Sequence, residues 1–274
     1  MANMNTTNLK NPQQVREIVR QNYGRVASGQ QHGCCGKDHP TATRAGQLGY
    51  SPQEIAAFPE GADLGLGCGN PQAIASLQPG ETVLDLGSGA GFDCFLAARS
   101  VGATGRVIGV DMTPEMLAKA RANAAKTNTA NVEFRLGQIE NLPVADNSVD
   151  VILSNCVINL SPDKPQVFRE AFRVLKAGGR FAVADIVRTA DLPAEVAGDL
   201  AALCGCVAGA ASIDEIETML REAGFQKILI RPKDASREFI RNWVPGGMAE
   251  DCVVSATIAA MKSAAPCCGP GCCD

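Results

Sequence analysis

A regular alternation of short apolar runs and longer helical stretches, from Glu81 to Ile186, constrains the fold of this chain more than any other feature. The expected strands are rich in β-branched residues and lie at 82–87, 106–111, 132–137, 149–155 and 180–186. The expected helices lie between them, near 91–100, 113–127 and 163–175. Near-continuous apolar strands that alternate with helices indicate a doubly wound, mostly parallel α/β sheet of the Rossmann-like kind.

The segments on either side of this core follow other patterns. The N-terminal part predicts an amphipathic helix at 12–23 and short helices that begin near residues 52 and 72. The C-terminal part predicts helices near 193–204 and 213–223, then strands at 227–232 and 252–261 that can form a closing antiparallel pair. We therefore expect four regions: an N-terminal helical extension with cysteine loops (1–80), a Rossmann-like domain (81–187), an α+β region (188–262) and a flexible cysteine-rich tail (263–274).

Charge and hydropathy exclude several classes of protein. The 274 residues include 25 Lys and Arg against 29 Asp and Glu, a formal net charge of −4 that favours neither nucleic acid nor an anionic membrane. The N-terminal residues lack the basic and apolar segments of a secretory signal, and the apolar stretch at 200–213 is too short to span a bilayer. We expect a cytoplasmic monomer without six disulfides, in which about half of the twelve cysteines are buried packing residues and the others serve metals, soft ions or redox chemistry.

A glycine-rich loop follows the first expected strand. It reads D-x-G-x-G-x-G from Asp85 to Gly91, and it precedes an expected helix. Glycines at such a turn let the backbone approach a ligand closely, although the same residues also suit a plain strand-to-helix connection. Asp111, 24 residues after Gly87, ends the second strand and is placed to accept hydrogen bonds from ribose hydroxyls. This context favours nucleotide-type binding over a purely structural turn.

With these motifs the sequence resembles the class I S-adenosylmethionine-dependent methyltransferases over about residues 80–187. The resemblance implies that the glycines pass under the cofactor and that Asp111 holds its ribose. It also implies that the loop after the third strand lies against the adenine and that the methyl group is delivered near the end of the fourth strand. The implied cofactor-binding residues are Asp85, Gly87, Ser88, Gly89, Gly91, Asp111, Met112, Ile139, Glu140 and Asn155.

Three cysteines stand out by position. Cys156 follows the strand at 149–155, where doubly wound sheets place their ligand crevice. Cys68 lies in a glycine-flanked loop, and Cys206 lies in the loop LCGCVAG. Each can be a buried small hydrophobe, but loop cysteines more often carry chemistry. If the three thiols converge on the crevice, they form a site for a soft, thiophilic ion.

The chain also resembles the arsenite methyltransferases over about residues 11–261, through the runs SNCVINLSPDKPQVFREAFRVLKAGGR, LGCGNP, GCVAGA, DLGSGAGFDC and DCVVSAT. The resemblance implies that Cys68, Cys156 and Cys206 bind trivalent arsenic. It also implies that one cysteine of the pair Cys34–Cys35, for which Cys35 is favoured, serves as a disulfide relay. Cys94 and Cys252 are interpreted as structural, and Cys204 has no assigned role.

The residue types suit that chemistry. Trivalent arsenic keeps a lone pair after it binds three thiolates, so methylation requires no general base, in keeping with a chain that has two histidines. The methylated arsenic is formally pentavalent, so thiols must supply electrons and leave a disulfide for thioredoxin or glutathione to reduce. The expected products are methylated arsenicals. Two alternatives are a methyltransferase for a small organic acceptor and a thiol-rich protein that buffers metalloids.

The C-terminal run CCGPGCC lies outside both resemblances. Its two vicinal cysteine pairs, Cys267–Cys268 and Cys272–Cys273, lack the C-x2-C spacing of most zinc sites. The tail is either an arsenic-capturing or thiol-exchanging segment, or a flexible end without function.

Overall fold

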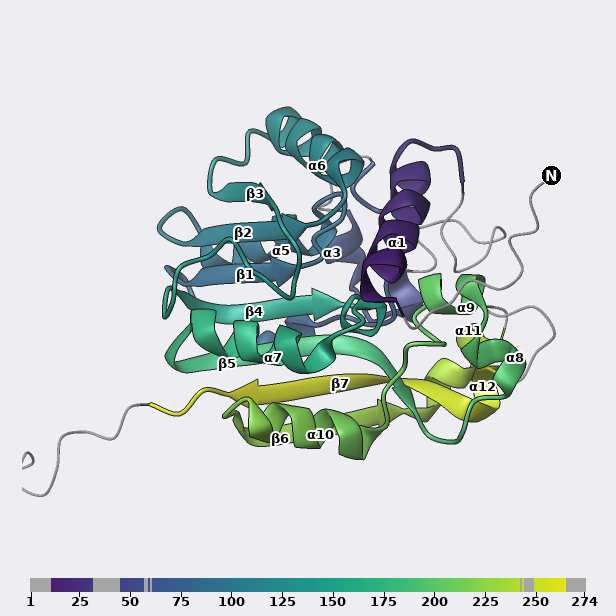
Figure 1. Cartoon of the computed structure of the whole chain (residues 1–274). Coiled ribbons are helices and arrows are strands. Elements are labelled where there is room, and N and C mark those ends of the chain that lie inside the picture. The colour runs from purple at the N-terminus through teal and green to yellow at the C-terminus, as the bar shows by residue number, and fades with distance from the viewer. Residues whose placement is uncertain are drawn as a thin grey trace, which may run out of the picture.

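The computed structural model describes residues 11–31, 45–56, 59, 61–241, 243 and 249–264. These residues form a seven-stranded sheet of order β3-β2-β1-β4-β5-β7-β6 (Figure 1). Its strands are β1 (Thr82–Leu86), β2 (Arg106–Asp111), β3 (Val132–Leu136), β4 (Val149–Asn155), β5 (Leu175–Arg188), β6 (Gln226–Lys233) and β7 (Val253–Met261). Strands β1 to β5 are parallel, and β7 runs antiparallel to both of its neighbours, β5 and β6. The expected doubly wound sheet and its closing antiparallel pair are confirmed.

Helices cover both faces of the sheet. Apolar residues of α7 and α10 pack against one face, whereas residues of α4, α5 and α6 pack against the other. Strand β1 serves both layers, because Leu84 and Leu86 point to the first layer and Val83 points to the second. The helices are α1 (Pro12–Ala27), α3 (Pro52–Ile55), α4 (Gln72–Ala75), α5 (Phe92–Val101), α6 (Pro114–Thr127), α7 (Lys164–Val174), α8 (Ala194–Ala197), α9 (Leu200–Cys204), α10 (Ile213–Glu222), α11 (Arg237–Ile240) and α12 (Ala249–Cys252).

Some expected elements have different bounds, among them α1, which continues to Ala27 rather than ending at 23. Strand β5 begins at Leu175 rather than at 180, because the glycine-containing segment continues to pair with β4 across an irregular register. The helix expected at 193–204 is two helices: Gly198 ends α8, and the Asp199 side chain accepts a hydrogen bond from the backbone N–H of Ala202 to begin α9. Cys252, expected to open the last strand, is instead the final residue of α12.

Helix α1 lies at the carboxyl ends of the parallel strands (Figure 1). It begins with Asn11, whose side chain accepts hydrogen bonds from the N–H groups of Gln13 and Gln14, and its buried side includes Val15 and Val19. The expected N-terminal amphipathic helix is therefore confirmed, and it covers the edge of the sheet where ligands bind in this kind of fold. Among the described residues, no helix has the length and apolar character needed to cross a membrane.

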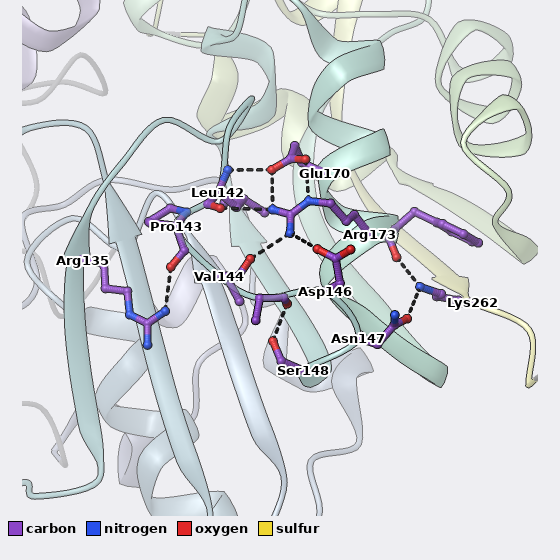
Figure 2. Close-up of polar contacts among 12 residues, drawn as sticks. Arg135, Leu142, Pro143, Val144, Asp146, Asn147, Ser148, Glu170, Arg173 and Lys262 are labelled. Carbon is purple, nitrogen blue, oxygen red and sulfur yellow. Dashed lines mark hydrogen bonds and ion pairs between the residues drawn. The ribbon is translucent and has the colours of Figure 1, made fainter.

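The loop between β3 and β4 is held by a side chain from α7 (Figure 2). Arg173 donates to the carbonyl oxygens of Val144 (2.9 Å) and Leu142 (3.1 Å), and it forms an ion pair with Glu170 (2.7 Å). Glu170 in turn accepts from the Leu142 N–H at 2.7 Å. These bonds raise the pKa of Arg173 and lower the pKa of Glu170, so both groups stay charged. The loop is thus fixed immediately after the segment that contains Glu140.

Candidate functional site

A cavity opens at the carboxyl ends of β1, β2 and β4, beneath α1. It encloses about 1200 Å³, counting the space open to solvent. The first turn after β1 lines it from below, and Arg16, Val19 and Tyr23 of α1 line it from the opposite side. The position is the crevice at which doubly wound sheets bind ligands.

The glycine-rich turn forms the floor of this cavity. Gly87 and Gly89 have φ angles of 70° and 52°, a backbone conformation that side chains disfavour, and a Cβ at Gly87 would lie 2.3 Å from Val157. Ser88 is buried and lines the cavity, and its hydroxyl has no hydrogen-bond partner among the described residues. A buried hydroxyl without a partner beside an open space fits a ligand that supplies the missing hydrogen bond.

Two acidic side chains stand at the ends of β1 and β2. Asp111 accepts hydrogen bonds from the backbone N–H groups of Gly89 (2.9 Å) and Thr113 (2.8 Å), so it links β2 to the glycine turn. Burial raises the pKa of Asp111, and these donors oppose the rise. Burial and the nearby charge of Asp93 raise the pKa of Asp85 well above its usual range. Both carboxylates face the cavity.

The other expected cofactor residues divide into two groups. Met112, Ile139, Glu140 and Asn155 line the cavity. Gly91 is not among its lining residues: it begins α5 with φ 93°, and a Cβ there would lie 2.7 Å from the ring of Phe95. The lack of a side chain at Gly91 makes room for the Phe95 ring, and contact between Gly91 and the cofactor stays a prediction.

The segments that carry the three expected arsenic ligands contact one another beside the cavity. A disulfide joins Cys68 and Cys156, which are 88 residues apart in the sequence and have Cα atoms 5.9 Å apart. The Cys206 thiol is not part of this disulfide, and it donates to the backbone oxygen of Cys156 at 2.8 Å. Cys156 and Cys206 line the cavity, whereas Cys68 is buried behind Gly67 and is not among the lining residues.

The backbone at the two cavity-lining cysteines is strained. Cys156 has φ 56° and Cys206 has φ 62°, values that residues other than glycine rarely adopt. The Cys156 turn is held by a hydrogen bond from its N–H to the oxygen of Ala184. Strain of this kind persists where the surrounding structure imposes it, and it gathers at functional sites.

A buried carboxylate lies beside the sulfur atoms. An oxygen of Asp185 and the sulfur atoms of Cys68 and Cys156 all lie within 4.8 Å of one another. Burial raises the pKa of Asp185 to about 6, against hydrogen bonds from the N–H groups of Ile186 and Ile158. Above pH 6 the cluster therefore places a negative charge next to the two disulfide sulfur atoms.

The turn after Cys156 also ties the separate cysteine segments together. The Asn159 side chain donates to Asp185 (3.0 Å) and to the backbone oxygen of Cys206 (3.4 Å). Burial lowers the pKa of the nearby Lys164 ammonium, and the charges of Asp185 and Cys206 oppose that shift. Asn159 thus links β5 with the segment that contains Cys206.

The remaining described cysteines take part in packing. Cys94 is fully buried and donates to Asp85 at 3.2 Å, and Cys252 donates to the oxygen of Asp191 at 3.4 Å. Burial raises the pKa of Cys204 to about 11, so this thiol stays protonated. The relay candidates Cys34 and Cys35, and the four cysteines of the tail, lie outside the described residues.

Several site residues were not expected from the sequence. Arg16 forms an ion pair with Glu140 at 3.1 Å across the cavity, and Trp243 lines the cavity near Cys206. Asp93 and Tyr50 form a buried hydrogen bond of 2.8 Å behind Asn155. These residue types are common and show no diagnostic spacing, so only the fold brings them together. Asp93 alone lies in a motif that the sequence analysis used, the run DLGSGAGFDC.

Comparisons with known proteins agree with this geometry. A model of the methyltransferase domain family matches residues 77–224. The chain is 52% identical to an arsenite methyltransferase of Halobacterium salinarum over 96% of this chain and 71% of that protein. It is 40% identical to an arsenite methyltransferase of Aquipseudomonas alcaligenes, but over 77% of this chain and 62% of that protein. The crystal structure of CrArsM, an arsenic(III) S-adenosylmethionine methyltransferase from Chlamydomonas reinhardtii, has a TM-score of 0.56 and 32% identity over 84% of this chain and 75% of that chain.

Proposed function

Because the chain belongs to the arsenite methyltransferase family, we propose that it transfers methyl groups from S-adenosylmethionine to trivalent arsenic bound by cysteine thiolates. The products are methylated arsenicals, and the process serves arsenic detoxification. The observation that carries the proposal is the meeting of Cys68, Cys156 and Cys206 at the edge of a cavity whose floor is the glycine turn. A methyltransferase for a small organic acceptor has no need of that sulfur cluster.

The cavity suits S-adenosylmethionine. Gly87 and Gly89 provide the left-handed backbone of the turn at the cavity floor, Asp111 offers carboxylate oxygens to a ribose, and the buried Ser88 hydroxyl has no hydrogen-bond partner among the described residues. Ile139 supplies an apolar surface for the adenine. When bound, S-adenosylmethionine supplies an electrophilic methyl group, and the lone pair of thiolate-bound arsenic accepts it.

The chain's own contribution is to hold the arsenic and to supply electrons. The Cys68–Cys156 disulfide must first be reduced, because sulfur atoms bonded to each other cannot bind arsenic. Three thiols then replace the three hydroxyl groups of arsenite, and each exchange releases water. Soft thiolates suit this soft centre, and the rigid strand end after β4 orients it toward the cofactor cavity.

The reductant enters as a second substrate. We propose thioredoxin or glutathione, with Cys35 or Cys34 as the relay that exchanges with the Cys68–Cys156 pair. The proposal places the protein in the cytoplasm, where such reductants keep thiols reduced, and treats it as a monomer. Thiol exchange after each methylation would then reopen the arsenic site.

The test is methylation of arsenite by the reduced, full-length protein with labelled S-adenosylmethionine. Product speciation should show methylated arsenicals whose yield rises with thioredoxin or glutathione. Calorimetry with S-adenosylmethionine alone should show binding, which a metalloid-buffering protein would lack. A protein that binds the cofactor but leaves arsenite unmethylated at every reductant concentration would point to another acceptor.

A further inference from the structure

The Asn155 side chain fastens the Cys68 loop to the end of β4. Its Oδ1 accepts a hydrogen bond from the Cys68 N–H (3.0 Å), and its Nδ2 donates to the Gly69 oxygen (2.8 Å). The loop fits closely around this amide, because a Cβ at Gly67, where φ is 103°, would lie 3.0 Å from it. The Asn155 amide therefore forms hydrogen bonds with both a backbone donor and a backbone acceptor of the loop that contains Cys68.

Tyr50 and Asp93 fix the orientation of that amide. Asn155 Nδ2 also donates to Asp93 Oδ2 (3.2 Å) and to the Tyr50 hydroxyl (3.1 Å), and this hydroxyl donates to Asp93 Oδ1 at 2.8 Å. Tyr50 and Asp93 are buried, with 3% and 6% of their surface exposed, and Asn155 is partly buried. A flipped amide would place its oxygen against the Asp93 carboxylate and the Gly69 carbonyl, and its NH2 group against the Cys68 N–H. The network thus allows one orientation.

The other side of Cys68 is also held. The Ser255 hydroxyl of β7 donates to the Cys68 backbone oxygen at 2.7 Å. Cys68 is thereby fixed through both its N–H and its carbonyl, although it lies in a loop and outside the cavity lining. Hydrogen bonds on both sides of Cys68 restrict the position of its backbone and hence the position of its sulfur atom.

We propose that Tyr50, acting through Asp93 and Asn155, positions Cys68 as the third arsenic ligand and so determines how well the enzyme uses arsenite relative to methylarsenite. The inference rests on the proposed function. Arsenite has three exchangeable hydroxyl groups and can take three thiolates, whereas methylarsenite has two and can take only two. In each exchange an As–S bond forms, an As–O bond breaks, and the thiol proton leaves with the hydroxyl as water.

The two substrates therefore depend differently on the network. Cys156 and Cys206 line the cavity, and under this proposal these two thiolates would suffice for methylarsenite. Only arsenite requires Cys68 as well. A fault in the positioning of Cys68 should consequently affect the first methylation and spare the next.

The experiment compares the two substrates in reduced, full-length Tyr50→Phe protein. We expect kcat/KM for arsenite to fall about tenfold, because two buried partners lose a hydrogen bond, while the value for methylarsenite stays within about twofold. Binding is followed separately by the fluorescence of Trp243, the sole tryptophan, which lines the cavity with Cys206. Ser100→Ala, which removes a hydroxyl from the outer part of α5, is the control and should match the wild type.

A double-mutant cycle separates positioning from general damage. If Tyr50 acts through Cys68, Tyr50→Phe should not weaken arsenite binding further in a Cys68→Ser background. Ser255→Ala, which loosens Cys68 from the other side, should reproduce the arsenite-selective loss even if Tyr50→Phe folds poorly. Equal losses for both substrates, or no loss for either, would overturn the inference. Failure of the wild type to methylate either substrate would instead overturn the proposed function.

Discussion

Removal of the Asp111 carboxylate is the sharpest test of the cofactor site. Its Oδ2 accepts from the Gly89 N–H and its Oδ1 accepts from the Thr113 N–H, at 2.9 and 2.8 Å. The carboxylate also lines the cavity, where a ribose hydroxyl can approach it. The side chain should therefore both shape the glycine turn and bind the cofactor directly.

The magnitude follows from these bonds. A hydrogen bond to a charged acceptor contributes about 1.5–3 kcal/mol, and loss of one such bond to ribose should weaken binding about 10- to 150-fold. Asp111→Ala should weaken S-adenosylmethionine binding by a factor within this range or above it, because the turn also loses its two backbone contacts. Asp111→Asn keeps one acceptor oxygen but turns an NH2 group toward the second N–H donor, so it should weaken binding less than the alanine variant does.

The assay is calorimetric titration of each variant with S-adenosylmethionine, with thermal unfolding followed in parallel. Glu133→Gln is the matched control, because it removes one carboxylate charge from the adjacent strand β3, where Glu133 pairs with Arg106 and Arg135 outside the cavity lining. Its affinity should equal that of the wild type. A folded Asp111→Ala protein with wild-type affinity would refute the ribose assignment and the reasoning from strand order.

Three further predictions concern the sulfur cluster, the buried charge and the tail. Cys156→Ser should abolish or sharply reduce arsenite methylation, because a hard hydroxyl is a poor ligand for arsenic, whereas Cys252→Ser should mainly change thermal stability; full activity of the first variant would contradict the ligand assignment. The raised pKa of Asp185, about 6, means that its stabilising effect is present below the unfolded value of 3.8 and is lost as pH rises through 6. Relative to wild type, Asp185→Asn should gain about 2 kcal/mol in unfolding free energy between pH 4 and pH 7, and urea-denaturation midpoints that change equally with pH in both proteins would contradict this. Truncation after Lys262 should leave the rate at saturating arsenite intact but lower it when arsenite is scarce, and superimposable rate curves would show that the tail is dispensable.

The cofactor half of the site could be predicted from the sequence because its signals are local. Asp85 and the glycines stand together in one turn, and Asp111 ends the next strand, so strand order alone places them at one edge. The parallel pairing of β1 with β4 likewise brings Asn155 beside the turn. The strand ends follow from the periodicity of buried strands, whereas the family resemblance implied the role of Asn155. In the structure Asp85, Gly87, Gly89, Asp111 and Asn155 line the cavity and Gly91 does not.

The sulfur half could not be derived in the same way. Cys68 and Cys156 are 88 residues apart, and no spacing rule joins a loop before the sheet to a strand end within it. Their convergence was implied by family resemblance, whereas Tyr50 and Asp185 carried no signal at all. Buried polar networks depend on contacts between distant segments, so they become visible only when the fold is known. The division of the expected 193–204 helix could have been predicted from the sequence. Gly198 is a residue type that often ends a helix, and Asp199 directly after it is a residue type that often begins one.

The two halves of the site are built on supports of different rigidity. The glycine turn and Cys156 follow neighbouring hydrogen-bonded strands, so their separation is fixed by the sheet, where adjacent strands lie about 4.8 Å apart. Cys68 and Cys206 come from segments outside the sheet and depend on side-chain bonds, from Asn155 and Ser255 in one case and from Asn159 in the other. The backbone of one proposed arsenic ligand, Cys156, is therefore held by the sheet, while the other two proposed ligands depend on side-chain hydrogen bonds. We expect this arrangement to let the Cys68–Cys156 disulfide open and close without disturbing the glycine turn.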